Sequence, residues 1–194
     1  AEAAAALEEM GYAGVAYLDA PLAELPHGLD DRAPAVRLWR PARFLAEVLP
    51  QVLASRPPPV GHRPTALDVA CGAGRDAVFL ATRGFETEAR DHAPEALERA
   101  QALARREGVA LRTVPCDLER ADLAPPGRLF DLVVCFRFLH RPLFPWIERA
   151  VAPGGWLVYE TYRAGQERFG KPRRAQFLLQ PGELAGAFPS LETL

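Results

Sequence analysis

From residue 65 onward, short apolar runs alternate with stretches in which apolar residues recur every three or four positions. The apolar runs predict strands at 65–70, 85–90, 111–114, 130–136 and 156–159. The stretches with helical periodicity predict helices at 75–83, 94–107 and 142–151. Strands that alternate with helices pack as a mostly parallel sheet with helices on both faces. The pattern therefore predicts an α/β fold.

The residues before this pattern predict two further parts. An alanine-rich helix at 1–10 ends at Gly11 and precedes a short strand at 15–18. Residues 21–60 form a proline-rich connector with a helix expected at 42–53, and the main domain is expected at 61–194. Because the chain does not begin with Met and residues 190–194 read as an unfinished strand, we expect it to lack both natural ends.

Charge and composition narrow the range of partners. The 194 residues carry a formal net charge of −2, which provides no general field for nucleic acid, so a small-molecule partner is expected instead. The three cysteines lack CxxC spacing, and no apolar stretch is long enough to cross a membrane. We therefore expect a cytoplasmic protein with reduced thiols. The four histidines have no metal-ligand spacing, so no metal is expected, and the oligomeric state is left open.

A glycine-containing loop, Asp68-Val69-Ala70-Cys71-Gly72-Ala73-Gly74, links the first expected strand to the first helix of the main domain. Glycines at the carboxyl end of a strand let a ligand approach the backbone, so a nucleoside cofactor is expected there. A plain turn is one alternative. Another is a nicotinamide nucleotide, because Gly72-x-Gly74-x-x-Ala77 fits the loose dinucleotide fingerprint. The Asp68 carboxylate favours a cofactor with an ammonium group, since it would repel a pyrophosphate.

Acidic residues also end the next two strands. Asp91 is placed to accept hydrogen bonds from ribose hydroxyls, and its alternative role is to cap the helix that begins near Pro94. Asp117 could accept a hydrogen bond from an adenine amino group, with Leu118 covering the ring, or it could be a surface turn residue. Both positions fit a nucleoside with an unphosphorylated ribose.

Five segments in this order resemble the motifs of class I S-adenosylmethionine-dependent methyltransferases and cover about residues 65–160. They are Leu-Asp-Val-Ala-Cys-Gly-Ala-Gly-Arg-Asp, Arg-Asp-His-Ala-Pro-Glu-Ala-Leu, Cys-Asp-Leu, Phe-Asp-Leu-Val-Val-Cys-Phe and Ala-Pro-Gly-Gly-Trp-Leu-Val-Tyr. Within the superfamily the chain is most similar to the tellurite-resistance and thiopurine-type small-molecule enzymes, through Gly-Ala-Gly-Arg-Asp, Asp91-His92 and Gln-Pro-Gly-Glu-Leu at 180–184. The first 19 residues resemble the end of a rhodanese domain, so a rhodanese-like remnant is expected at 1–20.

The resemblance implies a Rossmann-like methyltransferase fold, S-adenosylmethionine as cofactor, and a final antiparallel hairpin of which only the start at Leu191 is present. It implies roles for the expected cofactor-binding residues. Asp68, Gly72 and Gly74 would contact the methionine end of the cofactor, and Asp91 would bind the ribose. His92 would contact the face of the adenine ring, and Asp117 and Leu118 would bind the adenine. Ala70 stands where the family usually has glycine, and Phe136 is expected to form an aromatic wall.

The fourth strand ends in Phe-Arg-Phe-Leu-His-Arg, where many enzymes of this class begin their acceptor site. Arg137 and His140 are the expected catalytic residues, and the expected substrate residues are Arg137, Phe138, Tyr162 and Arg163. For His140 a packing or capping role is the alternative. The polar segment 163–174 could close over substrate or lie exposed as a basic loop.

These features predict methyl transfer to a small molecule, with a thiol or another chalcogen nucleophile favoured. The Asn/Asp-Pro-Pro-Tyr sequence of many nitrogen methyltransferases is absent. The alternatives are a non-catalytic S-adenosylmethionine-binding module, an NAD-binding oxidoreductase and an RNA methyltransferase.

Overall fold

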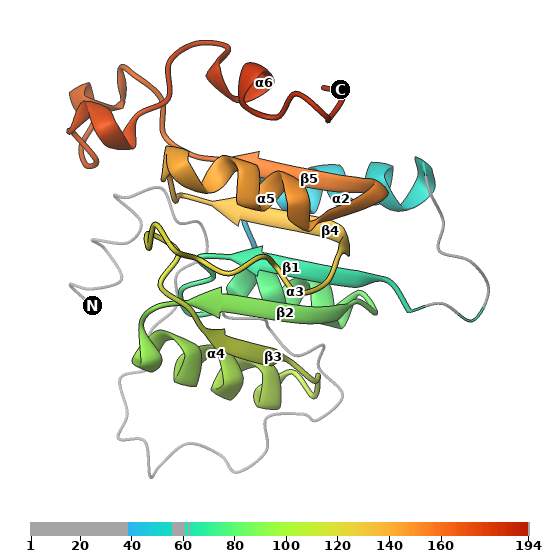
Figure 1. Ribbon diagram of the computed structural model, residues 1–194. Coiled ribbons are helices and arrows are strands. Elements are labelled where there is room, and N and C mark those ends of the chain that lie inside the picture. Colours follow the sequence, from blue (N-terminus) through green and yellow to red (C-terminus); the bar gives the residue numbers. More distant parts are fainter. Residues whose placement is uncertain (1–38, 56–60, 62, 194) are drawn as a thin grey trace, which may run out of the picture. The chain divides into compact units, whose positions relative to one another are not determined.

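The computed structural model describes residues 39–55, 61 and 63–193 (Figure 1). The expected helix at 1–10, the strand at 15–18 and the rhodanese-like segment lie outside these residues. The described elements, in chain order, are α2 (Arg43–Ser55), β1 (Thr65–Val69), α3 (Arg75–Thr82), β2 (Glu86–Asp91), α4 (Pro94–Arg106), β3 (Arg112–Pro115), β4 (Phe130–Phe136), α5 (Phe144–Ala150), β5 (Val151–Glu160) and α6 (Glu183–Ala187). One-turn 3₁₀ helices span Arg141–Leu143, Gln166–Arg168 and Ala175–Phe177.

The strands form one five-stranded sheet in the order β3-β2-β1-β4-β5. Every neighbouring pair is parallel. The chain moves outward from β1 to β3 and then returns to the other side of β1 with β4. The strand order therefore reverses between β1 and β4, and open sheets of this kind bind ligands outside the carboxyl ends of the strands at that point.

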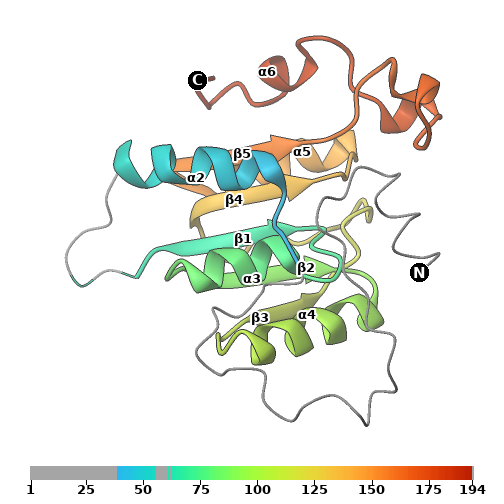
Figure 2. The same cartoon turned by 180° about the vertical axis from the view of Figure 1, so that it is seen from behind.

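Two hydrophobic clusters cover the two faces of the sheet, as expected for strands that are buried on both sides. On one face, Leu45 and Phe79 bring α2 and α3 against Leu132 and Val134 of β4. On the other face, Ile147 of α5 packs in a cluster with Leu67, Val133 and Cys135. Figures 1 and 2 show α5 and α2 on opposite sides of the sheet. The predicted α/β fold is confirmed.

Most element ends lie within two residues of the sequence prediction, and three larger differences occur. The helix expected at 142–151 is divided into the 3₁₀ turn Arg141–Leu143 and the shorter α5. The strand β5 begins at Val151 rather than at 156, with a register irregularity against β4 where the Ala-Pro-Gly-Gly sequence turns. The strand expected near Leu191 is wrong, because residues 190–193 form the end of a turn, a bend and irregular backbone. Leu191 instead packs its side chain against the α5-side cluster.

A buried ionic cluster stabilises the connection between β3 and β4. Glu88 in β2 is fully buried, and its carboxylate is paired with Arg90, Arg112 and Arg128. Arg90 also donates a hydrogen bond to the carbonyl of Pro126 at 2.9 Å, which holds the connection against the sheet. This part of the fold thus rests on side-chain hydrogen bonds, because residues 116–129 contain no helix.

Candidate active site

Most of the site residues expected from the sequence gather at one edge of the sheet. The loop after β1, the last residue of β2, and the segments after β3, β4 and β5 all lie at the carboxyl ends of parallel strands. Two non-glycine residues with positive φ stand directly after the central strands, Ala70 after β1 and Arg137 after β4, both at φ 58°. Backbone strain of this kind concentrates at functional sites. Here it marks the point where the strand order reverses.

The two glycines of the β1 loop serve different purposes. A Cβ on Gly74 would lie 2.4 Å from the Cβ of Ala100 in α4, so this glycine permits the close packing of α3 against α4. A Cβ on Gly72 would meet nothing within 4 Å and would project into open space. Gly72 therefore leaves room beside the loop that a ligand could occupy, and both glycines also adopt positive φ.

The Asp68 side chain faces the start of α3. Its carboxylate accepts a hydrogen bond from the Ala77 backbone N–H at 3.0 Å, and the residue is 2% exposed. Burial and the neighbouring Asp76 carboxylate raise the pKa of Asp68 well above its usual value. Asp68 thus holds the first turn of α3, which directly follows the loop, and its side chain is almost fully buried.

Asp91 joins the β1 loop to the start of α4. One carboxylate oxygen accepts the Gly72 N–H at 2.8 Å, and the other accepts the Ala93 N–H at 2.9 Å. The neighbouring His92 side chain is 79% exposed, with its Nδ1 3.5 Å from Asp91. Asp91 therefore orders the loop and closes the turn ahead of α4, but it does not cap the helix, whose N-cap residue is Ala93 without a side-chain cap hydrogen bond. A carboxylate oxygen that accepts one N–H retains the capacity to accept a hydroxyl.

The other expected cofactor residues differ in exposure. Asp117 is exposed, and its carboxylate accepts the Glu119 N–H at 3.1 Å. Leu118 and Phe136 are 4% and 7% exposed and belong to the two hydrophobic clusters on opposite faces of the sheet. These two side chains contribute mainly to the core rather than to an open wall.

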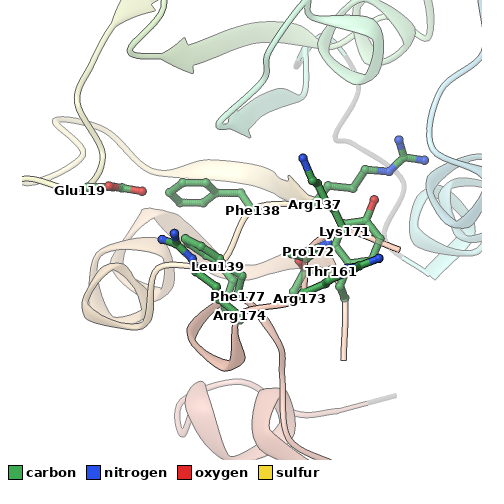
Figure 3. Close-up of a pocket in the computed structure, with 11 residues that line it drawn as sticks. Glu119, Arg137, Phe138, Leu139, Thr161, Lys171, Pro172, Arg173, Arg174 and Phe177 are labelled. Carbon is green, nitrogen blue, oxygen red and sulfur yellow. The ribbon is translucent and has the colours of Figure 1, made fainter. Parts of the chain in front are cut away.

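A pocket of about 600 Å³ opens beside the ends of β4 and β5 (Figure 3). Its lining residues come from the ends of those strands, from the segment after β3 and from the C-terminal segment: Glu119, Arg137, Phe138, Leu139, Thr161, Tyr162, Lys171, Pro172, Arg173, Arg174 and Phe177. The carbonyl of Phe138 accepts a hydrogen bond from the partly buried Tyr159 hydroxyl at 2.8 Å, which fixes the backbone at the pocket wall. Burial raises the pKa of that hydroxyl above its usual value, so it stays protonated and donates.

The pocket is positively charged. Its lining contains four cations, Arg137, Lys171, Arg173 and Arg174, and one carboxylate, Glu119. Among residues 39–55, 61 and 63–193, no carboxylate forms an ion pair with any of the four. In the view of Figure 3 the Phe138 ring lies between Glu119 and the Arg137 and Lys171 side chains. Cations without internal partners beside apolar walls favour an anionic ligand.

The pocket brings together three of the predicted substrate residues and omits two predicted residues. Arg137, Phe138 and Tyr162 line it, whereas Arg163 is exposed and His140 precedes the 3₁₀ turn, where its carbonyl accepts the Leu143 N–H at 2.9 Å. His140 thus occupies the N-cap position of that turn, but its side chain makes no cap hydrogen bond there. Sequence reasoning did not select Lys171, Phe177 or Glu119, although the glycine-interrupted polar segment at 163–174 was the signal for a cover over the site.

Two findings concern other kinds of site. The part of the chain that the structure describes contains no cluster of three or more potential metal ligands. Within the same residues, no helix has both the length and the apolar character needed to cross a membrane.

Comparison with known proteins places this geometry in a family context. Residues 66–155 match the family model described as a methyltransferase domain. The chain is 31% identical over 180 residues to human methyltransferase-like protein 27, a match that covers 88% of this chain and 70% of that protein. It is 33% identical over 94 residues to hemagglutinin 1 of Eikenella corrodens, covering 46% of this chain and only 31% of that relative.

A solved structure supports the fold. TehB of Haemophilus influenzae aligns with a TM-score of 0.57 and 18% identity, covering 75% of this chain and 51% of that one. At this identity the likeness extends to the fold alone.

Proposed function

The chain belongs to the class I S-adenosylmethionine-dependent methyltransferases, and on that premise we propose that it methylates a small anionic acceptor, with a thiol or related chalcogen nucleophile favoured. The main support for an anionic acceptor is the pocket at the ends of β4 and β5, which is lined by four cations and by apolar side chains.

The β1 loop and Asp91 are the residues best placed to hold the cofactor. The open space beside Gly72 fits a ligand next to the loop, and the Asp91 carboxylate borders the same loop at the end of β2. Asp117 and the exposed His92 lie at the neighbouring strand ends. When bound, S-adenosylmethionine supplies an electrophilic methyl group. Asp68 would act indirectly, by supporting the loop through Ala77.

On the acceptor side, the protein mainly orients the nucleophile and excludes water, because methyl transfer is an in-line displacement. Arg137 follows the central strand β4 and lines the pocket, so its guanidinium would attract an anion to the end of β4, which pairs with β1. Phe138 and Phe177 provide apolar surface for the body of the acceptor. An ionised thiol requires no strong base, which is consistent with the position of His140 outside the pocket lining.

The test is the formation of S-adenosylhomocysteine with a panel of acceptors: thiols with and without a carboxylate, selenite, tellurite, small carboxylic acids and bulk RNA. We expect turnover with an anionic thiol or chalcogen oxyanion, and a loss of at least tenfold in kcat/KM for Arg137→Ala. Arg43→Ala is the matched control, because Arg43 is an exposed arginine of α2 that pairs with Glu47.

The outcomes separate the competing functions. Preferential methylation of RNA would refute the small-molecule proposal. Calorimetric binding of S-adenosylmethionine without turnover of any acceptor would favour a non-catalytic binding module. A large loss of turnover for His140→Ala with little effect of Arg137→Ala would indicate an acceptor that must be deprotonated.

A further inference from the structure

Residues 163–178, called the cover segment from here on, follow β5, and the chain then returns at Leu179 to residues 162–164. The backbone closes the base of this segment: Ala164 N–H donates to the carbonyl of Leu179 at 2.8 Å, and Leu179 N–H donates to the carbonyl of Tyr162 at 2.9 Å. Between these bonds the chain carries Lys171, Arg173 and Arg174, three of the four cations of the pocket. The charge of the pocket therefore depends on where this segment lies.

The cover segment buries little apolar surface of its own. Leu178 is buried next to its base, but most residues from 163 to 176 are exposed, and the Phe169 side chain is 86% exposed. Segments with few buried apolar contacts open locally at low free-energy cost. Hydrogen bonds from outside the segment must therefore contribute much of its positioning.

Arg141 provides these bonds from the 3₁₀ turn after β4. Its guanidinium donates to the backbone carbonyls of Gln176 at 2.8 Å and Leu178 at 3.0 Å. It also forms a two-point contact with the Glu183 carboxylate of α6, where the longer bond is 3.0 Å. Glu183 in turn accepts the Gln180 N–H at 2.8 Å. One arginine thus joins the end of the cover segment, the following turn and α6 to the strand end that also carries Arg137.

Arg141 and Glu183 form a partly exposed ion pair, and the same guanidinium donates two hydrogen bonds to backbone carbonyls; this set of contacts is called the clasp. Paired, planar arginine–carboxylate contacts restrict orientation more than a single point contact does. The Glu183 carboxylate holds the guanidinium, and the remaining N–H groups reach the two carbonyls. Arg141 does not line the pocket, so any effect it has on the acceptor must pass through the cover segment.

We propose that Arg141 and Glu183 are positioning residues for acceptor recognition, holding the cover segment so that Lys171, Arg173 and Arg174 face the pocket. The proposal rests on the proposed function for its consequence in catalysis, although the clasp itself is a property of the chain alone. Loss of the clasp should weaken recognition of the acceptor's anionic group and leave the cofactor loop, which lies on β1, unaffected.

The kinetic test compares Arg141→Ala, Arg141→Lys and Glu183→Gln with the wild type and with the control Arg43→Ala. The acceptor pair is 2-mercaptobenzoate and thiophenol, which lacks the carboxylate. We expect KM for 2-mercaptobenzoate to rise at least tenfold in Arg141→Ala, with kcat changed less than threefold and the Kd of S-adenosylmethionine within twofold. Arg141→Lys should recover part of the loss, and KM for thiophenol should change little. An unchanged KM for 2-mercaptobenzoate, or equal losses for both thiols, would overturn the proposal.

Limited proteolysis with trypsin tests the clasp without any acceptor. Cleavage after Arg168, Arg173 and Arg174 should be at least tenfold faster in Arg141→Ala and in Glu183→Gln, at an unchanged melting temperature. Cleavage at the wild-type rate would refute the clasp even if the enzyme turns over small anions. Faster cleavage together with no turnover of any small molecule would support the clasp and reject the proposed function.

Discussion

Removal of the Asp91 carboxylate should destabilise the protein before any ligand is added. Its two oxygens accept the Gly72 and Ala93 N–H groups at 2.8 and 2.9 Å, and the residue is 8% exposed. A hydrogen bond to a charged group contributes about 1.5–3 kcal/mol, and an unsatisfied buried donor costs about 1–3 kcal/mol. Water can reach part of the loop in the variant, so we expect Asp91→Ala to lose about 2–4 kcal/mol of unfolding free energy.

The assay is urea unfolding of the ligand-free protein, with Asp117→Ala as the matched control. Asp117 also follows a parallel strand, but its exposed carboxylate accepts a single N–H at 3.1 Å, so its loss should stay below about 0.5 kcal/mol. A free energy of unfolding for Asp91→Ala within about 0.5 kcal/mol of the wild type would refute the bridging role.

The same position can be tested for contact with the cofactor. Asp91→Asn keeps one acceptor oxygen for the loop but removes the charge and presents an N–H₂ group on the other side. If the carboxylate also accepts ribose hydroxyls, calorimetry should show a loss of at least tenfold in S-adenosylmethionine affinity for the folded variant. Wild-type affinity would restrict Asp91 to the loop and the start of α4.

Three further changes separate structural from functional roles. Gly74→Ala should destabilise the protein by about 2 kcal/mol or more, because the new methyl group would meet Ala100 at 2.4 Å. Gly72→Ala should cost only about 1 kcal/mol of stability, for its positive φ, and should instead weaken S-adenosylmethionine binding. Urea unfolding and calorimetry distinguish the two variants, and equal stability of both would contradict the packing role of Gly74. Ala70→Gly should stabilise the protein by about 0.5–1 kcal/mol, because glycine removes the strain of φ 58° at some entropic cost, and a lower melting temperature would argue against strain at this residue. Burial and the Asp76 carboxylate raise the pKa of Asp68, so the folded state binds the Asp68 proton more tightly than the unfolded state does. The stability of the wild type should therefore fall relative to that of Asp68→Asn as pH rises from below the ordinary carboxyl pKa. If urea unfolding shows a stability difference that does not depend on pH, the charge of Asp68 is compensated in the folded state.

The local pattern of the sequence was sufficient for the fold and for the loop that follows β1. Apolar runs alternating with helical periodicity predicted all five strands of the sheet, since burial on both faces imposes that pattern along the chain. The Gly72 and Gly74 positions and the acidic residue ending β2 were visible for the same reason, because each requirement acts on the backbone close by. These motifs also predicted S-adenosylmethionine as the cofactor, which the family membership confirms.

The tertiary structure decided which side chains reach the open edge of the sheet. Phe136 and Leu118 follow the expected motifs, yet both are buried in the core, because the direction of a side chain at a strand end depends on the layer packed against it. His140 and Arg163 were selected for their proximity to the strand ends in sequence and lie outside the pocket lining.

The positions of the cover-segment cations were also not predictable from the local sequence. Lys171 and Phe177 reach the pocket only because the chain returns to Tyr162 at Leu179, and Arg141 contacts Glu183 across 42 positions of sequence. No local periodicity encodes such pairs, since each requires the whole sheet to bring distant segments together. The cofactor loop can thus be predicted from the local sequence, whereas the surface that would select the acceptor forms only in the folded protein.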